Sequence, residues 1–148
     1  MYAVAGVTGK TGAAVAGALL EAGSAVRVVV RRADAGSAWR ARGAEVAVAD
    51  LADGAALAAA LAGVQGAWLL NPPRYDVADP FVEAERVGAA YAHALATATV
   101  PRVVVLSSVG AHQAAGTGII GTARRVEQAL ADVRSPVAFL RANYFFEN

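Results

Sequence analysis

Six short apolar runs alternate with helical stretches along the whole chain, and this alternation constrains the fold more than any other feature. The strand-like runs, rich in β-branched residues, cover residues 2–5, 26–31, 45–49, 66–70, 102–107 and 136–141. Helical character is found at 11–22, 35–42, 54–62, 80–98 and 118–133. Such alternation indicates parallel strands joined by crossover helices. We therefore expect an α/β fold with a doubly wound, Rossmann-like parallel sheet, strand order 3-2-1-4-5-6, and helices on both faces.

Composition excludes several classes of function. The 148 residues suit one domain, and the net charge of +1 lacks the basic footprint of a nucleic-acid binder. Without cysteine there is no disulfide or thiol catalysis, and two histidines, His93 and His112, are too few and too far apart for a metal cluster. No apolar run reaches the ~18 residues of a membrane span, and a strand begins directly after Met1. We expect a cytoplasmic protein without a metal or a membrane contact.

The segment YAVAGVTGKTG, residues 2–12, allows two interpretations. A triphosphate-binding P-loop, G-x-x-x-x-G-K-[ST], would need a glycine where Val4 stands. The three glycines instead fit a strand-to-helix turn around a dinucleotide. Gly6 would allow the tight turn, Gly9 would let the backbone approach a pyrophosphate, and Gly12 would let the helix pack on the strand. The spacing G-x-x-G-x-x-G differs from the usual G-x-G-x-x-G, so a turn without a ligand is the alternative.

Residues at the other strand ends favour the dinucleotide. In a sheet of this order, ligands bind beyond the carboxyl ends of the strands, at the switch point between the first and fourth. The strand ends bring to that edge Arg31-Arg32, Asp50-Leu51, NPP at 71–73, SSVG at 107–110 and ANYF at 142–145.

The end of the second strand discriminates between cofactors. An NAD site places a carboxylate there for the ribose 2′-hydroxyl, whereas this chain has Arg31 and Arg32. Guanidinium groups hold a 2′-phosphate through paired, charge-assisted hydrogen bonds. Asp34 is interpreted as a helix N-cap. We expect NADP(H) to be preferred to NAD(H), the alternative being that both arginines are solvated loop charges.

Six motifs together resemble the NmrA-like branch of the atypical short-chain dehydrogenase/reductases, over essentially the whole chain. They are VAGVTGKTG, the arginine after the second strand, GAEVAVADLADGAALAAALAGVQGAWLLNPP, VVVLSSVGA, RRVEQAL and FLRANYFFEN. The family includes NADPH-dependent quinone reductases, azoreductase-like proteins, isoflavone-reductase relatives and non-catalytic redox sensors that bind transcription factors.

The resemblance implies a role for each strand end. The pyrophosphate would be held by Gly6, Thr8, Gly9, Lys10, Thr11 and Gly12, and the 2′-phosphate by Arg31 and Arg32. Asp50 and Leu51 would flank the adenine. The middle of the cofactor would be lined by the backbone of Asn71, Pro72 and Pro73, and the nicotinamide would lie near Ser107, Asn143 and Tyr144.

The chain departs from the wider superfamily in its catalytic pair. Short-chain dehydrogenases use Tyr-x-x-x-Lys for proton exchange, but the only lysine here is Lys10, and the places of the pair fall near Ile119 and Ala123. No catalytic residue is identified. Hydride transfer needs only a positioned nicotinamide, and a quinone could take its proton from water. We expect an NADPH-dependent oxidoreductase of the quinone or azo-reductase type. The alternatives are a non-catalytic NADPH/NADP redox sensor that regulates a partner protein, and a fragment whose function needs a missing lobe.

The end of the sequence is a second departure. Family members usually continue past NYFFEN into a small C-terminal lobe that closes the substrate cleft, and we expect that lobe to be absent here. Three aromatic residues, Tyr144, Phe145 and Phe146, follow the last strand. Exposed apolar clusters usually mark a partner surface, so we expect these rings to face the missing lobe or to join two copies in a homodimer. The alternative is that they fold back on the sheet edge.

Overall fold

The structure, a computed structural model, describes residues 1–72, 77–143 and 145. A six-stranded parallel sheet runs through it in the order β3-β2-β1-β4-β5-β6. This order and the Rossmann-like fold confirm the prediction from the sequence. The strands are β1 (Tyr2–Ala5), β2 (Val26–Val30), β3 (Glu45–Val48), β4 (Gly66–Leu70), β5 (Val103–Ser108) and β6 (Val137–Ala142).

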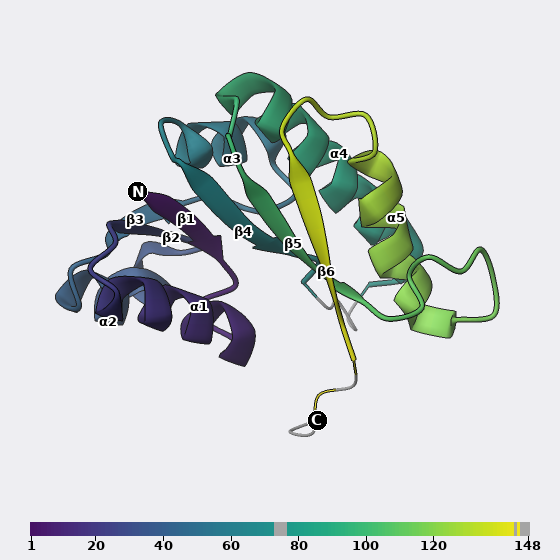
Figure 1. The fold of residues 1–148 in the computed structure, drawn as a ribbon, viewed down its shortest axis with the longest axis horizontal. Coiled ribbons are helices and arrows are strands. Elements are labelled where there is room, and N and C mark those ends of the chain that lie inside the picture. Colours follow the sequence, from purple (N-terminus) through teal and green to yellow (C-terminus); the bar gives the residue numbers. More distant parts are fainter. Residues whose placement is uncertain (73–76, 144, 146–148) are drawn as a thin grey trace.

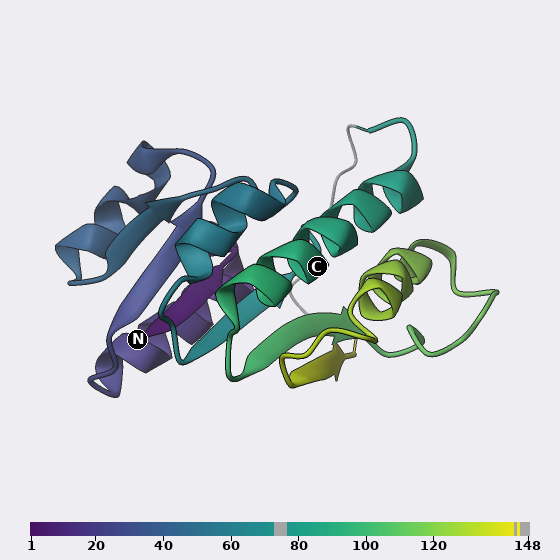
Figure 2. The same ribbon diagram turned by 90° about the horizontal axis from the view of Figure 1, so that it is seen from above.

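Helices cover both faces of the sheet, as Figures 1 and 2 show. They are α1 (Lys10–Glu21), α2 (Ser37–Ala41), α3 (Gly54–Leu61), α4 (Pro80–Ala98) and α5 (Gly121–Ala129), with 3₁₀ turns η1 (Ala33–Gly36) before α2 and η2 (Gly118–Ile120) before α5. The helix expected over 118–133 is therefore shorter: after Ala129 the chain turns and Leu130 enters the core. Within the described residues, no helix has both the length and the apolar character needed to cross a membrane.

Two separate hydrophobic cores lie on the two faces of the sheet. On one face, Leu57 and Leu61 of α3 and Val87 and Leu95 of α4 pack against Leu69 and its neighbours in β4 and β5. On the other, Val4 and Val28 pack against α1 and against Trp39 of α2. The second core is smaller because α1 and α2 lie beside β1, β2 and β3 and do not reach the other half of the sheet (Figure 1).

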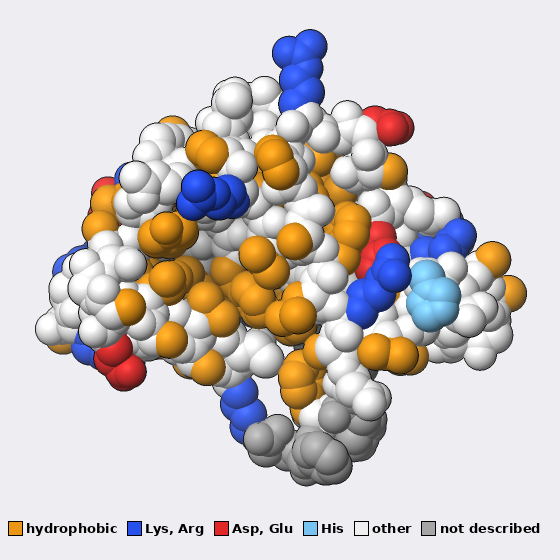
Figure 3. All heavy atoms as spheres, in the orientation of Figure 1, with side chains coloured by type: hydrophobic (Ala, Val, Ile, Leu, Met, Phe, Trp, Pro, Cys, Tyr) orange, Lys and Arg blue, Asp and Glu red, His pale blue; other side chains and the backbone are white. Residues whose placement is uncertain are grey.

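The half of the sheet beyond α1 is apolar and open on that face. Val105 of β5 and Phe139 of β6 face the larger core. Because side chains alternate along a strand, Val104, Leu106 and Leu140 point to the open face. Leu140 is 52% exposed. Figure 3 shows hydrophobic side chains gathered across the middle of this face.

Candidate functional site

The glycine turn after β1 is tightly built. Gly6 has a φ of +71°, which favours glycine, and a Cβ there would collide with the side chain of Leu70 from β4. A Cβ on Gly12 would collide with the carbonyl of Gly6, so α1 can start close to β1 only because Gly12 has no side chain. Gly9 is different, since the nearest atom to its added Cβ is the Gly6 oxygen at 3.5 Å. The first and last glycines therefore serve the fold, while the middle one leaves open space beside the turn.

Helix α1 begins at Lys10 with its N-terminus turned toward this edge of the sheet. Its N-cap residue, Gly9, makes no side-chain hydrogen bond, and the first turn contains no acidic residue. Such an N-terminus has backbone N–H groups and a positive dipole end that favour an anion. Thr11 and Gly12 continue the first turn.

A cleft of about 580 Å³ lies beside the turn, along the ends of β1, β2 and β3. The structure brings together in its lining these residues singled out in the sequence: Gly6, Thr8, Arg31, Arg32, Asp50, Leu51 and Pro72. Gly9, Lys10, Thr11 and Gly12 form the start of α1 next to the cleft and do not line it. Pro73 lies outside the described residues.

The two arginines after β2 differ in their surroundings. Arg32 donates from Nε to Oδ1 of Asp34 at 3.2 Å and from Nη2 to Oδ2 at 3.3 Å. These hydrogen bonds from Arg32 hold the pKa of Asp34 below its ordinary value. Arg31 is exposed and makes no hydrogen bond or ion pair with any residue in the described part of the chain. The interpretation of Asp34 as an N-cap is wrong, because η1 begins at Ala33 and Asp34 lies inside it, held by Arg32.

Two carboxylates, from Asp50 and Glu83, also line this cleft. Asp50 is exposed, and its Oδ1 accepts a hydrogen bond from the backbone N–H of Ala52 at 2.9 Å, which fixes the side chain at the start of the turn into α3. Glu83 from the first turn of α4 also lines the cleft and is paired with Arg86 at 2.9 Å. The sequence did not point to Glu83, because a glutamate in the first turn of a capped helix fits the helix dipole alone.

Tyr91 of α4 binds the end of β4 from within the larger core. It is fully buried in α4, and its hydroxyl donates to the backbone carbonyl of Leu70 at 2.6 Å. Burial raises the pKa of Tyr91 well above its ordinary value, so its hydroxyl stays protonated. This hydrogen bond fixes the end of β4. The side chain of Leu70 at this strand end packs against Gly6, and the chain continues from there into Asn71 and Pro72.

A second cleft of about 540 Å³ lies at the ends of β4, β5 and β6. It brings together three more of the predicted residues, Asn71, Ser107 and Asn143; Tyr144 lies outside the described residues. Ile119 and Ala123, the places of the missing Tyr-x-x-x-Lys pair, also line it. Every lining side chain in the described part of the chain is apolar or neutral, and none titrates near neutral pH.

Phe145 is the one described member of the aromatic trio after β6. It is 38% exposed and lines the second cleft. Tyr144 and Phe146 lie outside the described residues, so the expectation that all three rings meet a partner stays a prediction.

The hydroxyl of Ser107 does not point freely into the second cleft. It donates to Oε1 of Glu127 in α5 at 2.6 Å, and Arg141 of β6 binds both carboxylate oxygens of Glu127, at 3.0 and 2.7 Å. Burial alone would raise the pKa of Glu127, but the hydrogen bonds from Arg141 and Ser107 outweigh it and hold that pKa below its ordinary value. Neither Glu127 nor Arg141 could be picked out from the sequence, because Ser107, Glu127 and Arg141 lie on three separate elements.

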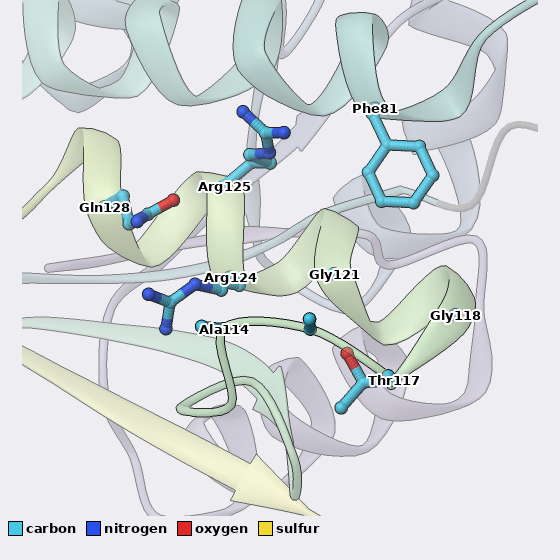
Figure 4. A pocket seen from close by; sticks show the side chains of 10 residues that line it. Phe81, Ala114, Thr117, Gly118, Gly121, Arg124, Arg125 and Gln128 are labelled. Carbon is cyan, nitrogen blue, oxygen red and sulfur yellow. The ribbon is translucent and has the colours of Figure 1, made fainter.

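A third cleft, of about 470 Å³, lies away from the strand ends, between α4, α5 and the loop before α5 (Figure 4). Arg124 and Arg125 both line it but point to different sides of α5. Arg124 donates to the carbonyl of His112 at 2.9 Å, and Arg125 pairs with Glu85 at 2.6 Å. Arg124 is engaged with the loop before α5 and Arg125 with α4, so these two side chains do not converge on one point of the cleft.

The sheet order, the glycine turn and the clefts at the strand ends together define a Rossmann-like α/β protein. The model of the NmrA-like family matches residues 2–148, and the chain belongs to that family. A search of curated proteins found no match.

Three solved structures illustrate the similarity. The triphenylmethane reductase of Citrobacter sp. has a TM-score of 0.87 at 24% identity, with 99% of this chain and 50% of that chain covered. The NADPH-dependent quinone oxidoreductase QOR2 of Escherichia coli, solved with NADPH, has a TM-score of 0.83 at 28% identity, covering 100% and 50%. A short-chain dehydrogenase/reductase superfamily protein of Agrobacterium tumefaciens, solved with bound NAD, has a TM-score of 0.76 at 26% identity, covering 95% and 48%. The chain thus spans about half the length of these proteins.

Proposed function

We propose that residues 1–148 form the NADP(H)-binding domain of an oxidoreductase that reduces quinones or azo dyes. The observation that carries the proposal is the shared cleft of the glycine turn and two arginines, Arg31 and Arg32, at the end of β2. The turn and the uncapped start of α1 suit a pyrophosphate, and the arginines suit a 2′-phosphate. Support also comes from the Escherichia coli quinone oxidoreductase, which was solved with NADPH.

The residues present fit a bound dinucleotide. Gly9 leaves room at the turn where a side chain would stand, and its φ of −107° is open to any residue, so the fold itself does not require a glycine there. A ligand that needs the space explains the glycine. Gly6, Thr8, Lys10, Thr11 and Gly12 would complete the phosphate site, Asp50 and Leu51 would flank the adenine, and Asn71, Pro72 and Pro73 would line the middle.

The preference for NADP(H) over NAD(H) is carried by the arginines. A relative solved with bound NAD has the same fold, so the fold does not select the cofactor. A carboxylate at the end of β2 would repel a 2′-phosphate, whereas Arg31 offers a guanidinium with no partner in the described part of the chain.

The second cleft would hold the acceptor, with Ser107, Asn143 and Tyr144 near the nicotinamide. When bound, the dinucleotide would supply a hydride. The lining side chains that the structure describes include no acid or base, so the acceptor must be able to take its proton from water. A quinone or an azo dye meets this condition, while an ordinary ketone needs a proton donor in the site.

One alternative is supported by the same observation. A non-catalytic sensor of the NADPH/NADP⁺ ratio, which regulates a partner protein, would also need no acid or base at Ile119 and Ala123. It would bind the dinucleotide without turning it over.

Two measurements on the same protein separate these functions. Fluorescence titration gives the dissociation constants of NADPH and NADH, and the absorbance of NADPH then follows its oxidation with a panel of quinones and azo dyes. Turnover supports the oxidoreductase, and tight binding without turnover supports the sensor. If neither dinucleotide binds, both proposals are wrong. Gly9→Val serves as the control for binding at the glycine turn.

We also propose that the open face of the sheet takes part in self-association as a homodimer. Leu140, which is 52% exposed, places apolar surface there, and Phe145, which is 38% exposed, lines the second cleft at the strand ends. Sedimentation equilibrium tests this directly, and Leu140→Glu should shift the equilibrium toward the monomer.

A further inference from the structure

The two arginines at the end of β2 are not equivalent. The guanidinium of Arg32 presents Nε and Nη2 as a fork, and both nitrogens are occupied by the carboxylate of Asp34. Arg31 keeps its donors for a ligand, since no residue in the described ranges binds it. Both arginines line the cleft beside the glycine turn.

A carboxylate and a phosphate compete for the same edge of a guanidinium group. Each accepts two parallel N–H hydrogen bonds from the fork. Arg32 can therefore use this edge for Asp34 or for a phosphate, but not for both at once. The competition is open to a ligand because the pair is exposed, with 77% of the Arg32 side chain and 69% of the Asp34 side chain accessible to solvent. Exposed pairs of this kind are weak and can be displaced.

We propose that Asp34 is a specificity-determining residue, which lowers the preference for NADP(H) by competing with the 2′-phosphate for Arg32. This inference rests on the proposed function. Arg31 then carries the basic preference, and Arg32 can offer its Nε–Nη2 edge to the phosphate only when that edge leaves Asp34. A dinucleotide that lacks the 2′-phosphate does not enter this competition, so its affinity is independent of the pair.

The experiment compares NADP⁺ and NAD⁺ as probes by isothermal titration of the whole chain. Asp34→Asn should tighten NADP⁺ binding about two- to fivefold, the range expected for releasing an exposed ion pair, and leave NAD⁺ binding unchanged. Glu21→Gln is the matched control: it removes one negative charge from a side chain that is 79% exposed. Glu21 is the last residue of α1, about 18 Å along the helix from the glycine turn. Its substitution should change neither affinity.

A second background isolates the role of Arg32. In Arg32→Ala, the additional change Asp34→Asn should have no effect on NADP⁺ binding, because no guanidinium is left to release. An equal tightening in both backgrounds would overturn the inference, as would an unchanged or weaker NADP⁺ affinity in Asp34→Asn alone. If the unchanged protein binds neither probe, the proposed function fails and the inference with it. If it binds NADP⁺ and only the Asp34 variants behave otherwise than expected, the inference alone fails.

Discussion

The hydroxyl of Tyr91 and the backbone carbonyl of Leu70 form a hydrogen bond of 2.6 Å inside the larger core. It connects the middle of α4 to the end of β4. The side chain of Leu70 in turn occupies the space above Gly6, where no Cβ would fit. The buried side chain of Tyr91 therefore fixes the position of the strand end against which the glycine turn packs.

Tyr91→Phe should lower the free energy of unfolding by about 1 kcal/mol, because it removes the hydrogen bond from a fully buried hydroxyl to the carbonyl of Leu70. Urea denaturation measures this. Tyr2→Phe is the matched control, since Tyr2 is only half-buried and its hydroxyl has no partner among the described residues; its effect should stay within about 0.5 kcal/mol. A loss at Tyr91 no larger than the loss at Tyr2 would show that the hydrogen bond does not hold the strand end.

Substitutions at two glycines of the turn should separate ligand binding from folding. Gly9→Val should abolish dinucleotide binding while the fold survives, because the added side chain enters space beside the turn and the backbone conformation suits any residue. Gly12→Val should instead prevent folding, because its Cβ would overlap the carbonyl of Gly6. Circular dichroism and NADPH titration of both variants check this. Normal NADPH binding by folded Gly9→Val would mean that the dinucleotide does not lie on this turn.

The cofactor preference should depend on Arg31. We expect NADP(H) to bind at least about tenfold more tightly than NAD(H), since a charge-assisted pair with a phosphate is worth about 1.5–3 kcal/mol. Arg31→Ala should remove most of this difference and leave NAD(H) affinity unchanged. Arg40→Ala, an exposed arginine of α2 that does not line the cleft, is the control. Equal affinities for the two cofactors in the unchanged protein would contradict the prediction.

Much of the fold could be predicted because parallel strands buried on both faces appear as continuous apolar runs. The expected helix at 80–98 agrees with α4, since Asp79 caps its N-terminus and Thr99, in the left-handed conformation, ends it. In place of the helix expected at 35–42, the structure has the 3₁₀ turn η1 followed by the short helix α2. Periodicity could not reveal that Asp34 binds Arg32 instead of capping a helix, because an aspartate at this position of the loop can do either.

The clefts were predictable only in outline. Strand ends of a parallel sheet must meet at one edge, and this places Arg31, Asp50 and Asn71 on the same side of the sheet. The direction of a side chain at a strand end depends on the packing of elements distant in sequence. No sequence pattern joins Ser107 with Glu127 and Arg141, because α5 and β6 come together only in the folded protein.

The bond between Ser107 and Glu127 predicts how stability changes with pH. Because the pKa of Glu127 is lowered in the folded protein, folding favours the charged form. The resulting stabilisation is fully present above the unfolded pKa, about 4.3, and is lost as the pH falls through the lower, folded value. Glu127→Gln should therefore lower the free energy of unfolding by about 1–3 kcal/mol at pH 7, since it removes the charged partner of Arg141 and one acceptor of a buried network. The difference from the unchanged protein should shrink as the pH falls below about 4.3, because the unfolded state then takes up a proton at Glu127 before the folded state does. Urea denaturation at several pH values measures it.

The control is Glu85→Gln, which removes the carboxylate of an exposed pair with Arg125 and should lower the free energy of unfolding by less than about 1 kcal/mol at pH 7. A deficit in Glu127→Gln that is the same at pH 3 and pH 7 would show that packing, and not the charge of Glu127, holds α5 against β5 and β6.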